Sequence, residues 1–160
     1  REAERLYAAA IEVARRPILY EQFGVQDTVD GRFDSLSLVV ILIMRQLKNC
    51  GADGKEVSQQ LFDSMFADMD LSLREMGAGD IGVSKRVRTM AEAFLGRLEA
   101  YVTALDHNDR TALAAALRRN LFRDDADPLR NGVVDYVFAL ASEITNLDSD
   151  DLLLGNLNLS

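Results

Sequence analysis

The sequence predicts an all-α protein, a single-domain bundle of about six or seven helices around a buried central helix. Apolar residues recur every three or four positions along most of the chain, which is the period of a helix buried on one face. One run, residues 36–44, is almost continuously apolar, as expected of a helix with protein on every side. The length of 160 residues suits one domain, which buries roughly 68–70% of the surface of its unfolded chain.

The N-terminal part of the chain is predicted to form a helix over residues 2–15 and a short segment over residues 18–23. Pro17 separates the two, because proline removes an amide donor that a continuing helix needs. A turn-rich connector follows this segment. Three of its residues could each cap the next helix through a side-chain oxygen: Asp27, Thr28 and Asp30.

Residues 33–49 are predicted to form the central helix. A run as apolar and β-branched as residues 36–44 could also be a buried strand. The length of the segment, the polar pair Arg45 and Gln46 near its end, and its helical neighbours favour the helix. As a helix the run rises only about 13 Å, which is too short for a membrane anchor. Gly51 is expected to stop the helix.

Residues 61–87 are the most distinctive stretch, in which a methionine-lined helix, a glycine-rich break and a basic helix start follow one another. Asp53 and Glu56 resemble a capping box at the start of the first helix. Three of the chain's five methionines make one face of this helix flexible and polarizable. The apolar residues of that face are Phe62, Met65, Phe66, Met69, Leu73 and Met76.

Three further helices are predicted in the second half of the chain. Ser84 is expected to cap the first, which carries steadily spaced apolar residues. Asp109 is expected to start the second after a polar turn, and Asp127 with Pro128 matches the start of the third. The leucine-rich tail, residues 148–160, is expected to dock on its own core or on another chain, and self-association through it is one hypothesis.

No catalytic, metal-binding or cofactor-binding constellation stands out in the sequence. Asp63 and Asp70 share one helix face and could belong to a metal-dependent hydrolase, which is the enzyme alternative. A carboxylate-bridged metal site in a helical bundle normally combines glutamate with histidine, and His107 is the only histidine. Cys50 is the only cysteine, so an inert thiol and a reducing compartment are expected. The formal charge of −8 argues against a general nucleic-acid-binding protein.

A binding or chaperone module is therefore favoured over an enzyme. Carboxylates beside the methionine face, and a cationic spot at the start of the next helix, are candidates for contact with a partner. Asn120 is a further candidate, because it takes a position that the apolar spacing would give to a core residue. The predicted partner-binding residues are Asp63, Met65, Met69, Asp70, Arg74, Glu75, Lys85, Arg86, Arg119 and Asn120.

Several segments, taken in order, carry a family resemblance. The segments are QDT and GRF within 26–33, RQL at 45–47, LFDSMFADMDLSLREMGAGDIGVSKRV at 61–87, AFLGR and AY within 93–101, and LAAALRRNLF at 113–122. Together they resemble the ubiquinol–cytochrome c chaperone family, assembly factors for the cytochrome bc complex. The resemblance covers residues 19–122 and looks more like the α-proteobacterial branch than the mitochondrial one. Val39 stands where the family often has histidine, and Leu95 where it often has an aromatic residue. The leucine-rich tail carries little of the resemblance.

The resemblance implies a non-enzymatic chaperone that binds newly made cytochrome b and holds it for haem insertion and assembly of complex III. It also implies a cytoplasmic protein peripheral at the inner membrane, on the matrix side in mitochondria. A small assembly partner and the ribosome are further contacts that it suggests. Exposed helices of such a client would suit an adaptable methionine surface, and its basic loops would suit nearby carboxylates. A helical adaptor with another partner is the remaining alternative.

Overall fold

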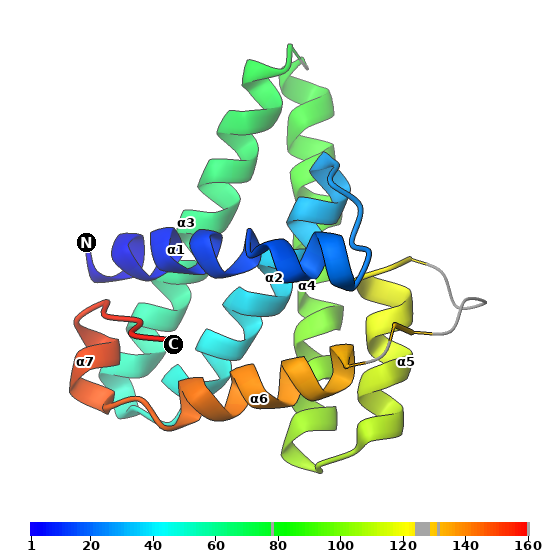
Figure 1. Cartoon of the computed structure of the whole chain (residues 1–160). Helices are drawn as coiled ribbons and strands as arrows, with labels where there is room; N and C mark the ends of the chain where they lie inside the picture. The colour runs from blue at the N-terminus through cyan, green and yellow to red at the C-terminus, as the bar shows by residue number, and fades with distance from the viewer. Residues whose placement is uncertain (78, 124–128, 131, 160) are drawn as a thin grey trace.

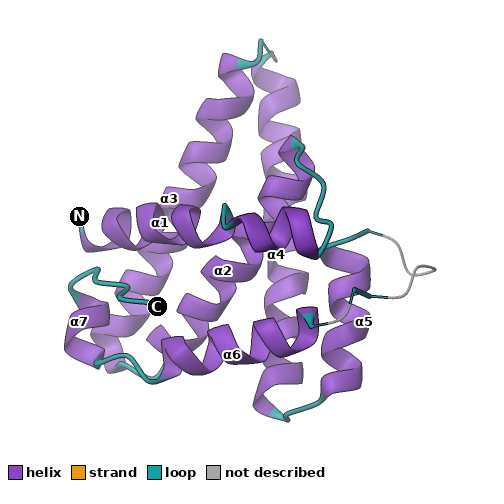
Figure 2. Ribbon diagram, viewed as in Figure 1, coloured by secondary structure: helices purple, strands orange, loops and turns teal. Residues whose placement is uncertain are grey.

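The computed structural model describes residues 1–77, 79–123, 129–130 and 132–159, and all regular secondary structure within them is helical (Figure 2). This confirms the predicted fold class. In chain order the elements are α1 (Glu2–Ala14), the short π-helix η1 (Ile18–Gln22), α2 (Val29–Leu47), α3 (Gly51–Glu75), α4 (Asp80–Asp106), α5 (Arg110–Asn120), α6 (Val133–Thr145) and α7 (Ser149–Leu153).

Helix α2 is the centre of the bundle and packs against α1, α3, α4, α6 and α7 (Figure 1). Every side chain from Leu36 to Ile43 is buried, so the prediction of an all-round buried helix is confirmed and the strand alternative is wrong. Of the three candidate caps, Thr28 begins the helix, and its hydroxyl oxygen accepts a hydrogen bond from the Gly31 amide at 3.1 Å.

Helices α3 and α4 form a long antiparallel hairpin whose outer end projects beyond the rest of the bundle (Figure 1). Where the hairpin crosses α2, a cluster of aromatic rings fills the interface. The Phe94 ring lies 5.7 Å from that of Phe66 and 5.4 Å from that of Phe62. Toward the end of the hairpin this packing stops, and Met76 and Ile81 are 64% and 88% exposed. No helix in the described part of the chain is long and apolar enough to cross a membrane.

A buried carboxylate joins three distant parts of the chain. Asp34 on α2 is only 1% exposed and accepts hydrogen bonds from Arg97 on α4 at 2.7 Å and from Arg123 at 2.7 and 2.9 Å. The Arg97 guanidinium also lies 5.3 Å from the centre of the Phe33 ring, where it makes a cation–π contact. The sequence analysis did not identify this cluster, which ties α4 and the segment after α5 to the central helix.

Three predicted helix starts are wrong, and in each case a glycine is the first residue of the helix or directly precedes it. Helix α3 begins after Cys50, whose side chain makes no capping bond, rather than at the Asp53 capping box. Helix α4 begins four residues before Ser84, because the extended backbone of Gly79 already redirects the chain.

Helix α6 begins at Val133 rather than at residue 128, because Gly132 adopts a left-handed conformation with φ 91° directly before it. Leu129 therefore precedes this helix. Asp127 and Pro128 lie outside the described residues. Asp109 caps α5 as predicted, with its carboxylate accepting from the Ala112 amide at 3.0 Å.

The leucine-rich tail docks on the chain's own core, the first of the two predicted alternatives. Leu152 is fully buried, and Arg5 on α1 donates a hydrogen bond to the Leu154 carbonyl at 2.7 Å. A Cβ atom on Gly155 would lie 2.7 Å from the Glu2 carbonyl oxygen, so only glycine fits this close approach. Self-association through the tail stays a prediction.

Replacing Asp34 by asparagine is expected to lower the free energy of unfolding by about 3–5 kcal/mol, because it leaves buried guanidinium charge without a counter-ion. Urea denaturation measures this loss. The matched control is Asp135→Asn, which removes an exposed ion pair with Arg110 and is expected to leave the midpoint unchanged. Equal midpoints for Asp34→Asn and the wild type would contradict a structural role for the cluster.

Two helical glycines give opposite expectations for substitution by alanine. A Cβ atom on Gly54 would lie 2.0 Å from the Leu47 carbonyl oxygen, whereas a Cβ on Gly96 meets nothing within 4 Å. Gly54→Ala is therefore expected to destabilise by about 1–3 kcal/mol through overpacking, and Gly96→Ala to stabilise by up to about 1 kcal/mol through helix propensity. Thermal unfolding of both variants checks this, and shifts in the same direction would contradict the packing of α2 against α3.

Candidate partner-binding groove

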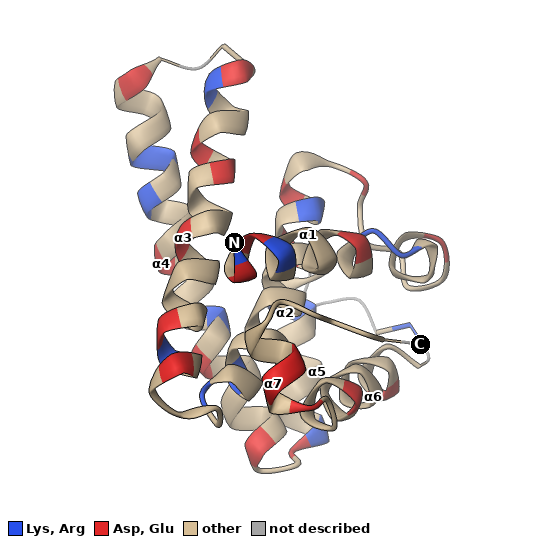
Figure 3. Ribbon diagram, turned by 90° about the vertical axis from the view of Figure 1, so that its left-hand side faces the viewer, with Lys and Arg blue, Asp and Glu red and all other residues tan. Residues whose placement is uncertain are grey.

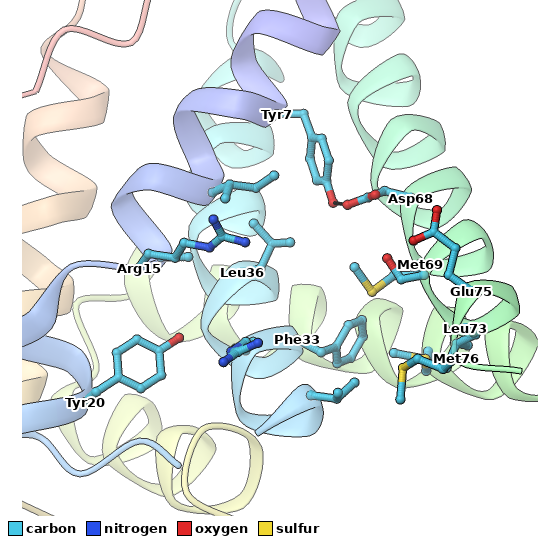
Figure 4. A pocket seen from close by; sticks show the side chains of 16 residues that line it. Tyr7, Arg15, Tyr20, Phe33, Leu36, Asp68, Met69, Leu73, Glu75 and Met76 are labelled. Atoms are coloured by element: carbon cyan, nitrogen blue, oxygen red, sulfur yellow. Dashed lines mark hydrogen bonds between the residues drawn. The ribbon is translucent and has the colours of Figure 1, made fainter. Parts of the chain in front are cut away.

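A groove of about 380 Å³ opens between α1 and the outer half of α3, with the first turns of α2 beneath it (Figure 4). The two helices come together at Tyr7 and Asp68 and diverge toward Tyr20 and Met76. The lining residues are Tyr7, Ile11, Ala14, Arg15, Tyr20, Val29, Arg32, Phe33, Leu36, Asp68, Met69, Ser72, Leu73, Glu75, Met76 and Met90. We call this the α1–α3 groove.

The floor of the α1–α3 groove is apolar and includes methionine. Phe33, Leu36 and Leu73 belong to the buried core and fix the floor, while Met69 is only partly buried. Met76 carries the apolar surface outward to the exposed end of the hairpin. Methionine side chains are unbranched and polarizable, so this surface can adapt to apolar groups of different shape.

The narrow end of the groove is held by a hydrogen bond from the Tyr7 hydroxyl to the Asp68 carboxylate, which links α1 to α3. Burial raises the pKa of Tyr7 well above its usual value, and the hydrogen bond and negative charge of Asp68 raise it further. The hydroxyl therefore stays protonated near neutral pH and keeps its donor. This bond fixes the spacing of the two helices where they meet.

The residues predicted for partner binding on α3 divide between the groove and other parts of the helix. Met69 and Glu75 line the groove. Met65 is fully buried, so its prediction as a contact residue is corrected: it is part of the hydrophobic core that α3 forms with its neighbouring helices.

Asp63, Asp70 and Arg74 do not line the groove, although they lie on the same helix. Asp63 accepts a hydrogen bond from Gln59, and Asp70 pairs with Arg74 at 2.6 Å. Arg74 also pairs with Asp80 across the glycine-rich turn. The Arg74–Asp80 pair therefore links α3 to α4 at the end of the hairpin, and all three side chains lie on a flank of α3 outside the groove.

The remaining predicted residues lie on other helices. Lys85 and Arg86 are on the first turns of α4, where Arg86 reaches Asp30 on α2 at 3.5 Å. Figure 3 shows basic residues on this part of α4 beside acidic residues on α3. Arg119 and Asn120 are in the last turn of α5. None of these four lines the groove, so the predicted set does not form one site.

Sequence reasoning missed several residues that shape the groove. Tyr7 lies on α1, Arg15 directly follows this helix and Tyr20 lies in η1; none of these side chains stands out from its local pattern. Asp68 on α3 is also absent from the predicted set. The sequence signal for Asp68 was its position next to Met69 on the methionine-lined helix. Its hydrogen bond with Tyr7 could not be predicted, because the two residues are 61 positions apart in the sequence.

The residues that could support catalysis do not converge in the described part of the chain. His107 is exposed at the end of α4, and its ring nitrogen lies 2.9 Å from the Thr103 carbonyl oxygen. Cys50 is half-buried between α2 and α3. Within the described ranges no three His, Cys, Asp or Glu side chains are grouped so as to hold a metal ion. The α1–α3 groove is thus suited to binding an apolar partner.

The chain is similar to known proteins along most of its length. The sequence model of the family described as ubiquinol-cytochrome C chaperone matches residues 21–159. The chain is 29% identical over 154 residues to ubiquinol-cytochrome-c reductase complex assembly factor 1 of Xenopus laevis, covering 95% of this chain and 76% of the frog protein. It is 25% identical to the human protein of the same name, but spans only 51% of its length.

The crystal structure of the Cbp3 homolog from Brucella abortus has the same fold. It is 35% identical to this chain with a TM-score of 0.86, over 99% of this chain and 88% of that one. The family match also continues beyond residue 122, where the resemblance recognised in the sequence ended, and takes in most of the leucine-rich tail. The chain belongs to the ubiquinol–cytochrome c chaperone family.

Proposed function

We propose that this protein is a non-enzymatic assembly chaperone of the ubiquinol–cytochrome c reductase complex, and that it binds newly made cytochrome b in the α1–α3 groove. Membership of the chaperone family and the names of the relatives support the role in assembly. The observation that carries the site is the methionine-lined groove, which opens onto the exposed apolar end of the hairpin.

The chemistry of a membrane-protein client fits this surface. Before assembly, such a client exposes apolar helices that need cover, and an apolar groove between helices is a common receptor for a helix. Met69 and Met76 can adjust to side chains of several shapes. Glu75 on the rim offers negative charge to the basic loops that flank helices on the cytoplasmic side of a membrane.

A location at the periphery of the inner membrane follows from this role, on the cytoplasmic side in a bacterium or the matrix side in a mitochondrion. A small assembly partner, the ribosome and self-association through the tail are predictions that rest on family resemblance or on the tail sequence. A helical adaptor for another client is the alternative function. The experiment below separates it from the proposal.

Met76→Glu places a charge on the exposed wall of the groove and is expected to reduce recovery of cytochrome b with the tagged protein about tenfold. The reason is that burying an unpaired carboxylate against an apolar client disfavours the complex. The measurement is a pull-down from membranes of the source cell, with cytochrome b quantified by mass spectrometry. Leu154→Glu is the matched control, since Leu154 is 54% exposed against 64% for Met76 and lies on the tail.

The double variant Asp63→Lys, Asp70→Lys tests the flank of α3 that points away from the groove. Recovery of cytochrome b is expected to stay at the wild-type level. A loss with this variant, together with normal recovery for Met76→Glu, would move the site to that flank. Absence of cytochrome b from every pull-down, with complex III unaltered when the gene is deleted, would leave a helical adaptor.

A further inference from the structure

The charges of the α1–α3 groove are divided between its two walls, and we propose that the groove selects a helix with an apolar stripe flanked by basic residues on one side and acidic residues on the other. The division would also fix the direction in which this helix lies. The inference rests on the proposed function only in taking the groove as the place where a protein partner binds.

The α3 wall is acidic. Glu75 is exposed and makes no ion pair within the described residues. Asp68 uses its Oδ2 atom for Tyr7, which leaves Oδ1 free to accept from a bound partner. Figure 4 shows both carboxylates on the α3 side of the groove, beside Met69. Basic side chains of a bound helix would therefore be favoured along this wall.

The opposite wall, from α1 and the start of α2, is basic. Arg15 is exposed, points into the groove in Figure 4 and makes no ion pair in the described chain. Arg32 pairs with Asp27 through its Nε atom at 2.8 Å, so its terminal nitrogens remain available. The Tyr20 side chain adds a further polar group on this side. Acidic side chains of a bound helix would be favoured here.

The arrangement fits a helix better than a lipid surface. Both signs of charge face each other across one concave groove whose floor is apolar. A helix with three distinct faces satisfies the floor and both walls at once, and it packs naturally between two diverging helices. A bilayer surface is broad and flat, so it cannot enter the concave groove to contact both walls and the floor at once.

The test uses three fluorescent 18-residue helical peptides with the same leucine stripe. One has lysine on one flank and glutamate on the other, the second lysine on both flanks, and the third glutamate on both. Anisotropy titrations with the intact protein are expected to show the mixed peptide binding about fivefold more tightly than either of the others. This preference should shrink in 0.5 M salt, because exposed charges are then screened.

Glu75→Lys replaces an acidic side chain of the α3 wall by a basic one, so that both walls then carry basic side chains, and it is expected to shift the preference to the peptide with glutamate on both flanks. Arg15→Glu should shift it to the peptide with lysine on both flanks. Asp63→Lys is the matched control, because it makes the same kind of change on α3 outside the groove, and it should keep the wild-type order.

Equal affinity of the wild type for all three peptides, absence of binding up to 1 mM, or an unchanged order in Glu75→Lys would overturn the proposal. Failure of this proposal can be distinguished from failure of the proposed function. Peptide selection as expected, without cytochrome b in the pull-down, would retain the groove specificity and refute the client. Recovery of cytochrome b without peptide selection would retain cytochrome b as the client and refute the groove specificity.

Discussion

The structure depends on the burial of α2 on every side. A helix with apolar side chains all round cannot lie at a surface, so α1, α3, α4, α6 and α7 must cover it. Within this apolar surrounding, Asp34 needs counter-charges, because an ionised carboxylate removed from water without partners is strongly disfavoured. Arg97 and Arg123 supply them, and the same contacts hold α4 and the segment after α5 in place.

The proposed binding surface, the α1–α3 groove, lies where this cover ends. Helices α3 and α4 extend past α2, so the outer half of α3 has no complete set of neighbours, and α1 meets it only at the narrow end of the groove. Met65 and Met69 show the consequence, because they lie one turn apart on one helix. Met65 is part of the closed core, whereas Met69 lines an open groove. The proposed binding site therefore depends on α3 being longer than α2.

Much of the fold could be predicted from local spacing, because the period of a helix is a property of neighbouring residues. The central helix, the methionine-lined helix and the Asp109 cap are confirmed on that basis. Contacts between distant residues could not be predicted: Asp34 and Arg123 are 89 positions apart, and spacing along the chain says nothing of such a pair. The predicted starts of α4 and α6 were wrong, because the chain begins both helices directly after a glycine, Gly79 or Gly132, and not at the predicted capping side chains. For the groove, the sequence indicated the wall formed by α3 but not the wall formed by α1.

Site-specific photocrosslinking during synthesis of cytochrome b tests the central claim most directly. A photoreactive amino acid at position 76 probes the α1–α3 groove, and one at position 95 probes a separate hollow beside Phe62 where Leu95 is 52% exposed. The proposed function predicts a crosslink to cytochrome b from position 76 and none from position 95. A crosslink from position 95 alone would contradict the assignment of the groove as the client site.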